Sequence, residues 1–161
     1  MTLPDWLPPM LDLDSDWDAC LPQLYAVFER DFKRGNLKLA GDPVWYDRRI
    51  IDGYEACFWH LITREHQKTH SRGPDFRRAE RLPWCAVILH HAHDPAVKFW
   101  RYKEGSGVIR TYAWLEEGDY VVVLEPKQKQ IGLVAFMITA YHVDGSSRRR
   151  NLQQRYEKRE L

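Results

Sequence analysis

The first regular pattern along the chain is an apolar stripe at helical spacing. Its members recur at intervals of three and four residues, and they are Trp17, Leu21, Leu24, Tyr25, Phe28 and Phe32. Residues at this spacing share one face of an α-helix. Asp14, Ser15 and Asp16 can cap its first turn, and Gly35 marks its end. The pattern therefore predicts an amphipathic helix between these two signals.

Three shorter helices are predicted between Gly35 and the middle of the chain. They cover residues 53–65, 76–81 and 83–91. The first buries an apolar face that consists of Tyr54, Phe58, Leu61 and Ile62. The segments 35–52 and 66–75 have no regular period and contain Gly-Asp-Pro or Gly-Pro turn signals, so they predict irregular loops.

From residue 96 onward the period of the apolar positions changes from 3.6 to 2. This alternation predicts four strands, at residues 96–102, 108–115, 120–125 and 131–143. Short connections between successive strands favour an antiparallel meander. The third strand is apolar throughout, which is typical of a strand covered on both faces. After Gly145-Ser146-Ser147, a basic helix is predicted over residues 147–158.

The order of elements predicts an α+β fold, with N-terminal helices packed on a four-stranded antiparallel β-meander and a C-terminal helix. A chain of 161 residues is the length of one domain. Its regions are an acidic helical part (1–52), a helical segment (53–95), the sheet (96–143) and the basic helix (147–158). Neither GxGxxG nor GxxxxGK[ST] occurs, so no nucleotide cofactor is expected.

The start of the chain and its cysteines indicate a cytoplasmic protein. The first 20 residues contain five Asp and no Lys or Arg, unlike a secretory or transit signal. No run approaches 18 apolar residues, so no membrane span is expected. Cys20, Cys57 and Cys85 are odd in number and lack CxxC spacing. They predict reduced core thiols.

Charge is unevenly placed although the net charge is only +1. Residues 1–31 hold seven acids and one base, whereas residues 64–81 hold six bases and three acids. Residues 145–161 hold six bases and two acids. Local basic surface attracts phosphate even when the total charge is near zero. The alternative is that these runs are solvated helix surfaces.

Two groups of helical residues can carry chemistry. His60 lies off the apolar stripe of its helix beside Arg64, and an imidazole titrates near neutral pH. Arg78 and Arg81 are three residues apart, so both can face one side of a helix and clamp a phosphate. The structural alternatives are a surface histidine and salt bridges to Asp75 or Glu80.

Alternation sorts polar and aromatic residues onto single faces of the strands. One face of the first strand carries Lys98, Trp100 and Tyr102, and one face of the second carries Arg110, Tyr112 and Trp114. On the fourth strand, Thr139 and Tyr141 share a face. Cations mixed with aromatic rings suit single-stranded RNA, because bases stack on rings and phosphates meet cations. The alternative is a set of cross-strand aromatic pairs. The register that would align these faces is not encoded locally.

A set of histidines offers a weaker hypothesis, that of a metal site. Its members are His66, His70, His90, His91 and His93. His66 and His70 have the i, i+4 spacing that binds metal on a helix, but Gln67 stands where a zincin has Glu. Helix-end and loop histidines are the simpler interpretation, so no metal is assigned.

Four segments resemble a known superfamily. They are Phe58-Trp59-His60-Leu61-Ile62-Thr63-Arg64-Glu65, Asp75-Phe76-Arg77-Arg78-Ala79-Glu80-Arg81, Asp119-Tyr120-Val121-Val122-Val123-Leu124 and Thr139-Ala140-Tyr141. Together they are similar to bacterial and prophage members of the barnase–EndoU–colicin–RelE-like (BECR-fold) nuclease superfamily. The likeness spans residues 45–158. It implies helices on a four-stranded antiparallel sheet and metal-independent RNA cleavage by a toxin or phage-related effector.

The resemblance also implies roles for individual residues. His60 would be the general acid or base, Arg78 and Arg81 would bind phosphate, and Thr139 or Tyr141 would position the scissile group. Substrate contacts are expected from Arg64, Lys98, Arg110 and Tyr112. RNA is the expected ligand, a cognate antitoxin or immunity protein a possible partner, and no cofactor or membrane is implied.

Other functions stay open on the same sequence. A non-catalytic RNA- or protein-binding module would bind RNA without forming product. An aromatic sheet face could instead form a homodimer or toxin-partner interface. A metal-bound hydrolase would need the histidine set. The leading hypothesis is a ribonuclease in which the RNA 2′-hydroxyl attacks its adjacent phosphorus.

Overall fold

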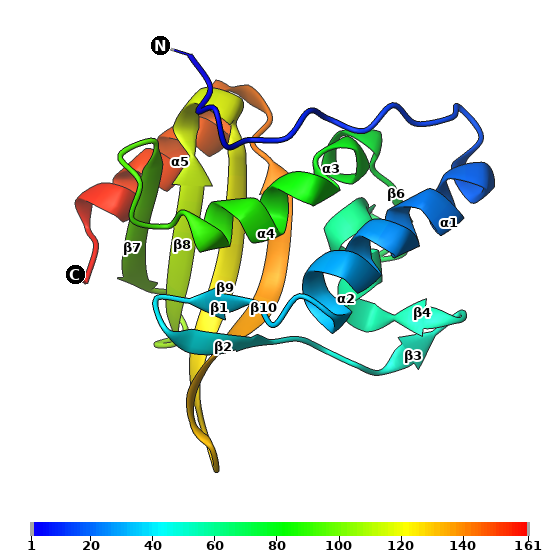
Figure 1. The fold of residues 1–161 in the computed structure, drawn as a ribbon. Coiled ribbons are helices and arrows are strands. Elements are labelled where there is room, and N and C mark those ends of the chain that lie inside the picture. The colour runs from blue at the N-terminus through cyan, green and yellow to red at the C-terminus, as the bar shows by residue number, and fades with distance from the viewer. Residues whose placement is uncertain (1, 161) are drawn as a thin grey trace.

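The computed structural model describes residues 2–160, and Figure 1 shows how its elements are arranged. The helices are α1 (Trp17–Phe28), α2 (Ala56–Ile62), α3 (Phe76–Glu80), α4 (Leu82–His90) and α5 (Gly145–Glu157), with a π-helical turn η1 (Glu29–Lys33) and a 3-10 turn η2 (Glu116–Gly118). The strands are β1 (Lys38–Leu39), β2 (Asp42–Trp45), β3 (Ile50–Ile51), β4 (Tyr54–Glu55), β5 (Thr63–Glu65), β6 (Arg72–Pro74), β7 (Val97–Lys103), β8 (Ile109–Leu115), β9 (Tyr120–Lys129) and β10 (Gly132–His142). The α+β class is confirmed.

The main sheet has six strands, in the order β1-β2-β10-β9-β8-β7. The predicted antiparallel meander is its β7–β10 part. The prediction of a purely antiparallel four-stranded sheet was wrong, because β2 pairs with β10 in parallel, through Val44 and Trp45. The meander alone would leave the backbone groups of β10 unpaired at its edge. A four-residue strand from the segment predicted as a loop satisfies part of that edge.

The second helix is shorter than its sequence pattern predicted. Residues 53–55 belong to a β3–β4 hairpin whose turn has positive φ angles at Asp52 and Gly53. The helix α2 begins at Ala56 and ends where Thr63 enters β5. The β5–β6 pair also takes residues 72–74 from the predicted 66–75 loop.

One face of the sheet packs against the N-terminal helices. Figure 1 shows α4 crossing in front of the sheet, with α1 and α2 beside it. Phe28 from α1, Phe58 from α2 and Leu89 from α4 share one core cluster with Val122 of the sheet. Cys20, Cys57 and Cys85 are buried free thiols, as the sequence predicted. The apolar stripe of α1 therefore has the role that its spacing indicated.

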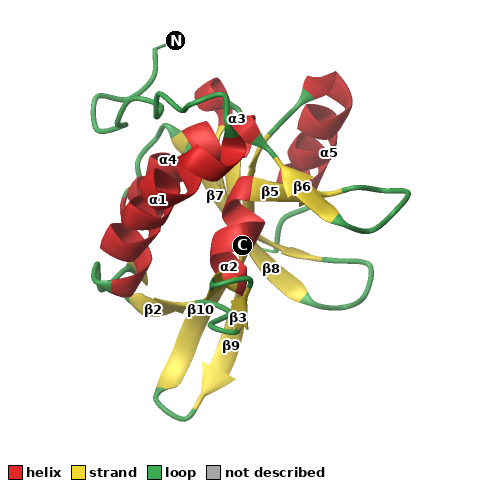
Figure 2. Cartoon of the chain, turned by 90° about the vertical axis from the view of Figure 1, so that its right-hand side faces the viewer, coloured by secondary structure: helices red, strands yellow, loops and turns green. Residues whose placement is uncertain are grey.

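The opposite face of the sheet is covered by α5, as Figure 2 also shows. Leu152 of α5 is 3% exposed and packs in a second cluster with Trp100, Tyr112 and Trp114. Trp100 stacks on Tyr112 with ring centroids 5.0 Å apart. The aromatic face predicted as a base-stacking platform is therefore largely an internal packing surface.

A bulge in β10 decides which residues reach the α5 side. Met137 pairs with Leu124, and Thr139 pairs with Val123, so Ile138 is an extra residue between them. An extra residue reverses the facing of every later side chain. Met137 lies in the core on the α1 side, whereas Tyr141 packs on the α5 side. The bulge thus turns Thr139 and Tyr141 toward α5.

Within residues 2–160, no helix combines the length and the apolar character needed to cross a membrane.

The dependence of α5 on one apolar anchor is testable. We expect Leu152→Ala to lower the free energy of unfolding by about 2–5 kcal/mol, since a buried leucine is removed from a packed cluster. Urea denaturation, monitored by tryptophan fluorescence, measures this change in the free energy of unfolding. The matched control is Gln154→Ala on the exposed side of α5, which should change stability by less than about 0.5 kcal/mol. Equal effects of the two substitutions would contradict the packing described.

Candidate functional site

A cleft of about 370 Å³ opens between the sheet and α5. It is called the arginine cleft here, and its lining includes Arg78, Arg110, Arg148, Arg155, Glu104, Tyr112, Thr139, Tyr141 and Asn151. Four guanidinium groups thus face one cavity that, among the described residues, has one carboxylate in its wall. Such a cavity attracts a ligand with several negative oxygens.

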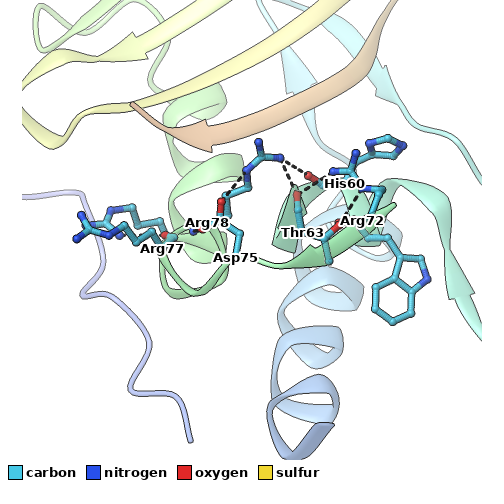
Figure 3. Close-up of polar contacts among 8 residues, drawn as sticks. His60, Thr63, Arg72, Asp75, Arg77 and Arg78 are labelled. Carbon is cyan, nitrogen blue, oxygen red and sulfur yellow. Dashed lines mark hydrogen bonds and ion pairs between the residues drawn. The ribbon is translucent and has the colours of Figure 1, made fainter. Parts of the chain in front are cut away.

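Arg78 is the central side chain of the site and comes from α3. One terminal nitrogen, Nη1, donates to the carbonyl oxygens of His60 (3.1 Å) and Thr63 (2.7 Å). Its Nε lies 3.3 Å from Asp75 Oδ2, and its guanidinium carbon lies 5.5 Å from the centre of the Tyr141 ring. Figure 3 shows the contacts of Arg78 with His60, Thr63 and Asp75 at the end of α2. Burial lowers the pKa of Arg78 from its very high usual value, so an anion in the cleft would relieve a desolvated charge.

The carboxylate of Glu104 lies in the hairpin loop that follows β7. Its Oε2 accepts a hydrogen bond from the hydroxyl of Tyr112 (2.5 Å), and its Oε1 lies 3.6 Å from Nη2 of Arg155. The Glu104 side chain keeps 17% exposure. Arg110 approaches a different carboxylate, that of Glu125, at 3.7 Å. Glu104 is therefore the group in the cleft that can accept a proton.

Tyr141 supplies a second hydroxyl to the cleft. Burial raises its pKa, against the opposing effect of Arg155, Arg148 and Arg78. Its phenol therefore keeps its proton at neutral pH and can act as a hydrogen-bond donor. Thr139 lies two residues earlier on the same strand face and also lines the cleft.

A narrow pocket of about 30 Å³, called the arginine notch here, adjoins the cleft. It is lined by Arg64, Asp75, Arg77, Arg78, His142, Asp144 and Arg148. Arg78 and Arg148 line both cavities. Burial lowers the pKa of His142, and the nearby charges of Arg81 and Arg77 lower it further. The imidazole beside these arginines is thus that of His142.

His60 lines a different cavity, of about 380 Å³, together with Trp17, Trp59 and Arg72. In Figure 3 its imidazole and the side chain of Arg77 point in opposite directions, and only its backbone carbonyl meets Arg78. Burial lowers the pKa of His60, and the charge of Arg72 lowers it further. The expected meeting of this imidazole with the guanidinium groups of Arg78 and Arg81 in one cleft is not seen.

Arg81 and Lys98 make structural contacts outside the arginine cleft. Arg81 donates to the carbonyl of Arg77 (2.9 Å) and lies over the Trp84 ring. Lys98 binds Glu116 (3.2 Å) and the side chain of Gln153 (2.9 Å), which ties β7 to α5. Arg64 lines the notch. The five residues from the sequence prediction that share the cleft are Arg78, Arg110, Tyr112, Thr139 and Tyr141.

The histidines weighed for a metal site are dispersed. His91 stacks on Trp6 with ring centroids 4.2 Å apart, and His93 packs edge-on against Phe99. His70 lies 3.8 Å from Glu65. Within residues 2–160, no three His, Cys, Asp or Glu side chains are grouped as metal ligands would be.

Known proteins do not add to this picture. Comparison of the chain with protein families, with curated proteins and with solved structures finds no match. The site is therefore defined by its own geometry.

The sequence prediction missed several residues of the cleft and notch, among them Arg148, Arg155, Glu104 and His142. Arg148 and Arg155 belong to the basic run at residues 145–161, which was a usable signal because residues seven apart lie on the same face of a helix. Glu104 and His142 carried no such signal. Glu104 lies in a turn, and the position of His142 depends on the bulge at Ile138.

The electrostatics of the notch can be tested by NMR. We expect the imidazole of His142 to titrate below its usual pKa of 6.5, since burial and neighbouring cations disfavour its charged form. The substitution Arg77→Gln should raise this pKa by removing one cation. Arg34→Gln, at an exposed arginine that follows η1, should leave it unchanged. A His142 pKa above 6.5, or one insensitive to Arg77→Gln, would contradict the placement of these groups.

Proposed function

We propose that this chain binds single-stranded RNA in the arginine cleft and cleaves it without a metal ion. In this reaction a 2′-hydroxyl attacks its adjacent phosphorus. The observation that carries the proposal is the gathering of Arg78, Arg110, Arg148 and Arg155 around one cavity with a carboxylate and two phenols. Guanidinium groups pair with phosphate oxygens bidentately. A phosphate between them would sit beside groups able to accept and donate protons.

Two groups of the cleft carry out the proton transfers of the reaction. Glu104 takes the proton of the 2′-hydroxyl as the new O–P bond forms. The bond from phosphorus to the 5′ oxygen breaks, and the hydroxyl of Tyr141 protonates the leaving oxygen. The products are a 2′,3′-cyclic phosphate and a free 5′-hydroxyl. Proton transfer of this kind contributes about 10²–10⁴-fold, and preorganised cations stabilise the charge that gathers on the phosphoryl oxygens.

The aromatic groups of the cleft restrict how RNA could lie there. Trp114 is fully buried and Trp100 is 3% exposed beneath α5, so neither offers a ring face to a base. The Tyr141 ring, half-buried at the cleft and beside Arg78, is the better candidate for contact with a nucleotide. The proposal therefore rests on phosphate recognition more than on base stacking.

A second candidate is an RNA-binding module that does not cleave. The observation that favours it is the state of Glu104, whose carboxylate is bound by Tyr112 and faces Arg155. Both contacts occupy carboxylate oxygens that a general base would use to reach the 2′-hydroxyl. This module would bind RNA in a salt-dependent manner and release no product.

The catalytic proposal predicts a strong effect of Glu104→Gln. We expect the wild-type protein to release 2′,3′-cyclic phosphate ends from total RNA in EDTA, measured by gel analysis and mass spectrometry of the ends. Glu104→Gln keeps an acceptor for Tyr112 but removes the base, so the cleavage rate should fall by about 10²–10⁴-fold. RNA binding should be retained.

The matched control for this experiment is His60→Ala. Its imidazole lines a separate cavity, so cleavage should stay within a few fold of wild type. Loss of cleavage in His60→Ala with full activity in Glu104→Gln would move the proton transfer to the α2 pocket and refute the role of the cleft. Binding without any cleavage by the wild type would support the non-catalytic module.

A further inference from the structure

Two basic segments far apart in the sequence meet at the arginine notch. Arg64, Arg77 and Arg78 come from the run at residues 64–81, and Arg148 comes from the first turns of α5. Arg78 and Arg148 also line the arginine cleft, so the two cavities adjoin across these shared side chains. The basic surface therefore continues beyond the cleft, past the end of β10.

The cations of the notch are not neutralised by the protein itself. Within residues 2–160, the side chains of Arg64, Arg77 and Arg148 form no ion pair at 4.0 Å or less. Asp75, one of two carboxylates in the wall, is engaged by Arg78, whose backbone N–H also donates to it (3.1 Å). Asp144 alone remains to oppose three exposed guanidinium groups. The notch consequently has an excess of positive charge.

The size of the notch limits what it can hold. The notch has about 30 Å³, against about 370 Å³ for the arginine cleft. This smaller volume favours a compact group, such as a non-bridging phosphate oxygen, over a nucleobase. The chemistry selected here is thus an anionic oxygen flanked by arginine side chains.

We propose that the arginine notch is a second phosphate subsite, which makes the ligand a polynucleotide strand and not a mononucleotide. The inference rests on the proposed function, in which the cleft takes one RNA phosphate. The strand runs from the arginine cleft, over Arg78 and Arg148, to Arg64 and Arg77 beside the end of β10. The two shared arginines lie between neighbouring phosphates and contact both.

The subsite can be tested by the length dependence of binding. The ligands are 2′-O-methyl oligouridines, which lack the attacking hydroxyl, in the form of a dinucleotide and an octanucleotide. In Arg64→Gln/Arg77→Gln, affinity for the octanucleotide should fall by about tenfold. The slope of log K against log salt should become shallower by roughly 0.7, the value for one phosphate contact on a single strand. Affinity for the dinucleotide, which has one phosphate, should not change.

The matched control removes the same number of positive charges outside the arginine cleft and the arginine notch. Arg34→Gln/Arg101→Gln removes two exposed arginines that line neither cavity, and it should leave both affinities and the salt slope near wild type. NMR gives a second readout. The NMR signals of the His142 imidazole should shift on addition of the octanucleotide and stay unchanged with the dinucleotide.

The outcomes separate this inference from the proposed function. Octanucleotide binding that is equally weakened by both double variants would overturn the subsite, because general charge would then account for it. Equal losses for dinucleotide and octanucleotide would overturn it too, since the notch would then belong to a single site. Failure of the wild type to bind the octanucleotide would refute the proposed function itself.

Discussion

The arrangement of the site depends on the guanidinium group of Arg78. This group joins α3 to the end of α2 by two hydrogen bonds to carbonyl oxygens and lies against a ring of β10. Its side chain is only 13% exposed, so each of these contacts replaces hydration that the charge has lost. A partly satisfied buried charge is costly. One side chain thus holds three elements together and leaves part of its charge directed at the cleft.

The helix α5 gives the second constraint, because it both closes the sheet and forms the cleft. Leu152 packs on the aromatic residues of β7 and β8, while Gln153 of α5 accepts a hydrogen bond from Lys98 of β7 and Arg149 pairs with Glu116 of η2. This packing removes most of the aromatic face from solvent. The same helix brings Arg148 and Arg155 over the strand that carries Tyr141. In the proposed function, RNA is therefore recognised by phosphate binding in the arginine cleft and not by base stacking on an open sheet.

The acidic groups determine how this positive charge can be used. Asp75 orients Arg78, Glu125 lies near Arg110, and Glu104 faces Arg155. Each pairing offsets the local positive charge of the arginine and fixes the direction of its flexible side chain. Three arginines of the notch, Arg64, Arg77 and Arg148, have no such partner within the described residues. The proposed function therefore assigns an external anion to these three side chains and a positioning role to the paired arginines.

Local pattern was sufficient for the α+β order of elements, the helix with the Trp17–Phe28 stripe, the β7–β10 meander and the segregation of residues such as Tyr112 on one strand face. These features follow from periods of 3.6 and 2, which neighbouring residues determine. The tertiary structure alone decided that β2 joins β10, that Ile138 forms a bulge and that α5 covers the aromatic face. Such contacts join residues distant in sequence, so no local period encodes them. For the same reason the sequence indicated His60 as the imidazole near Arg78, whereas the bulged strand brings His142 there.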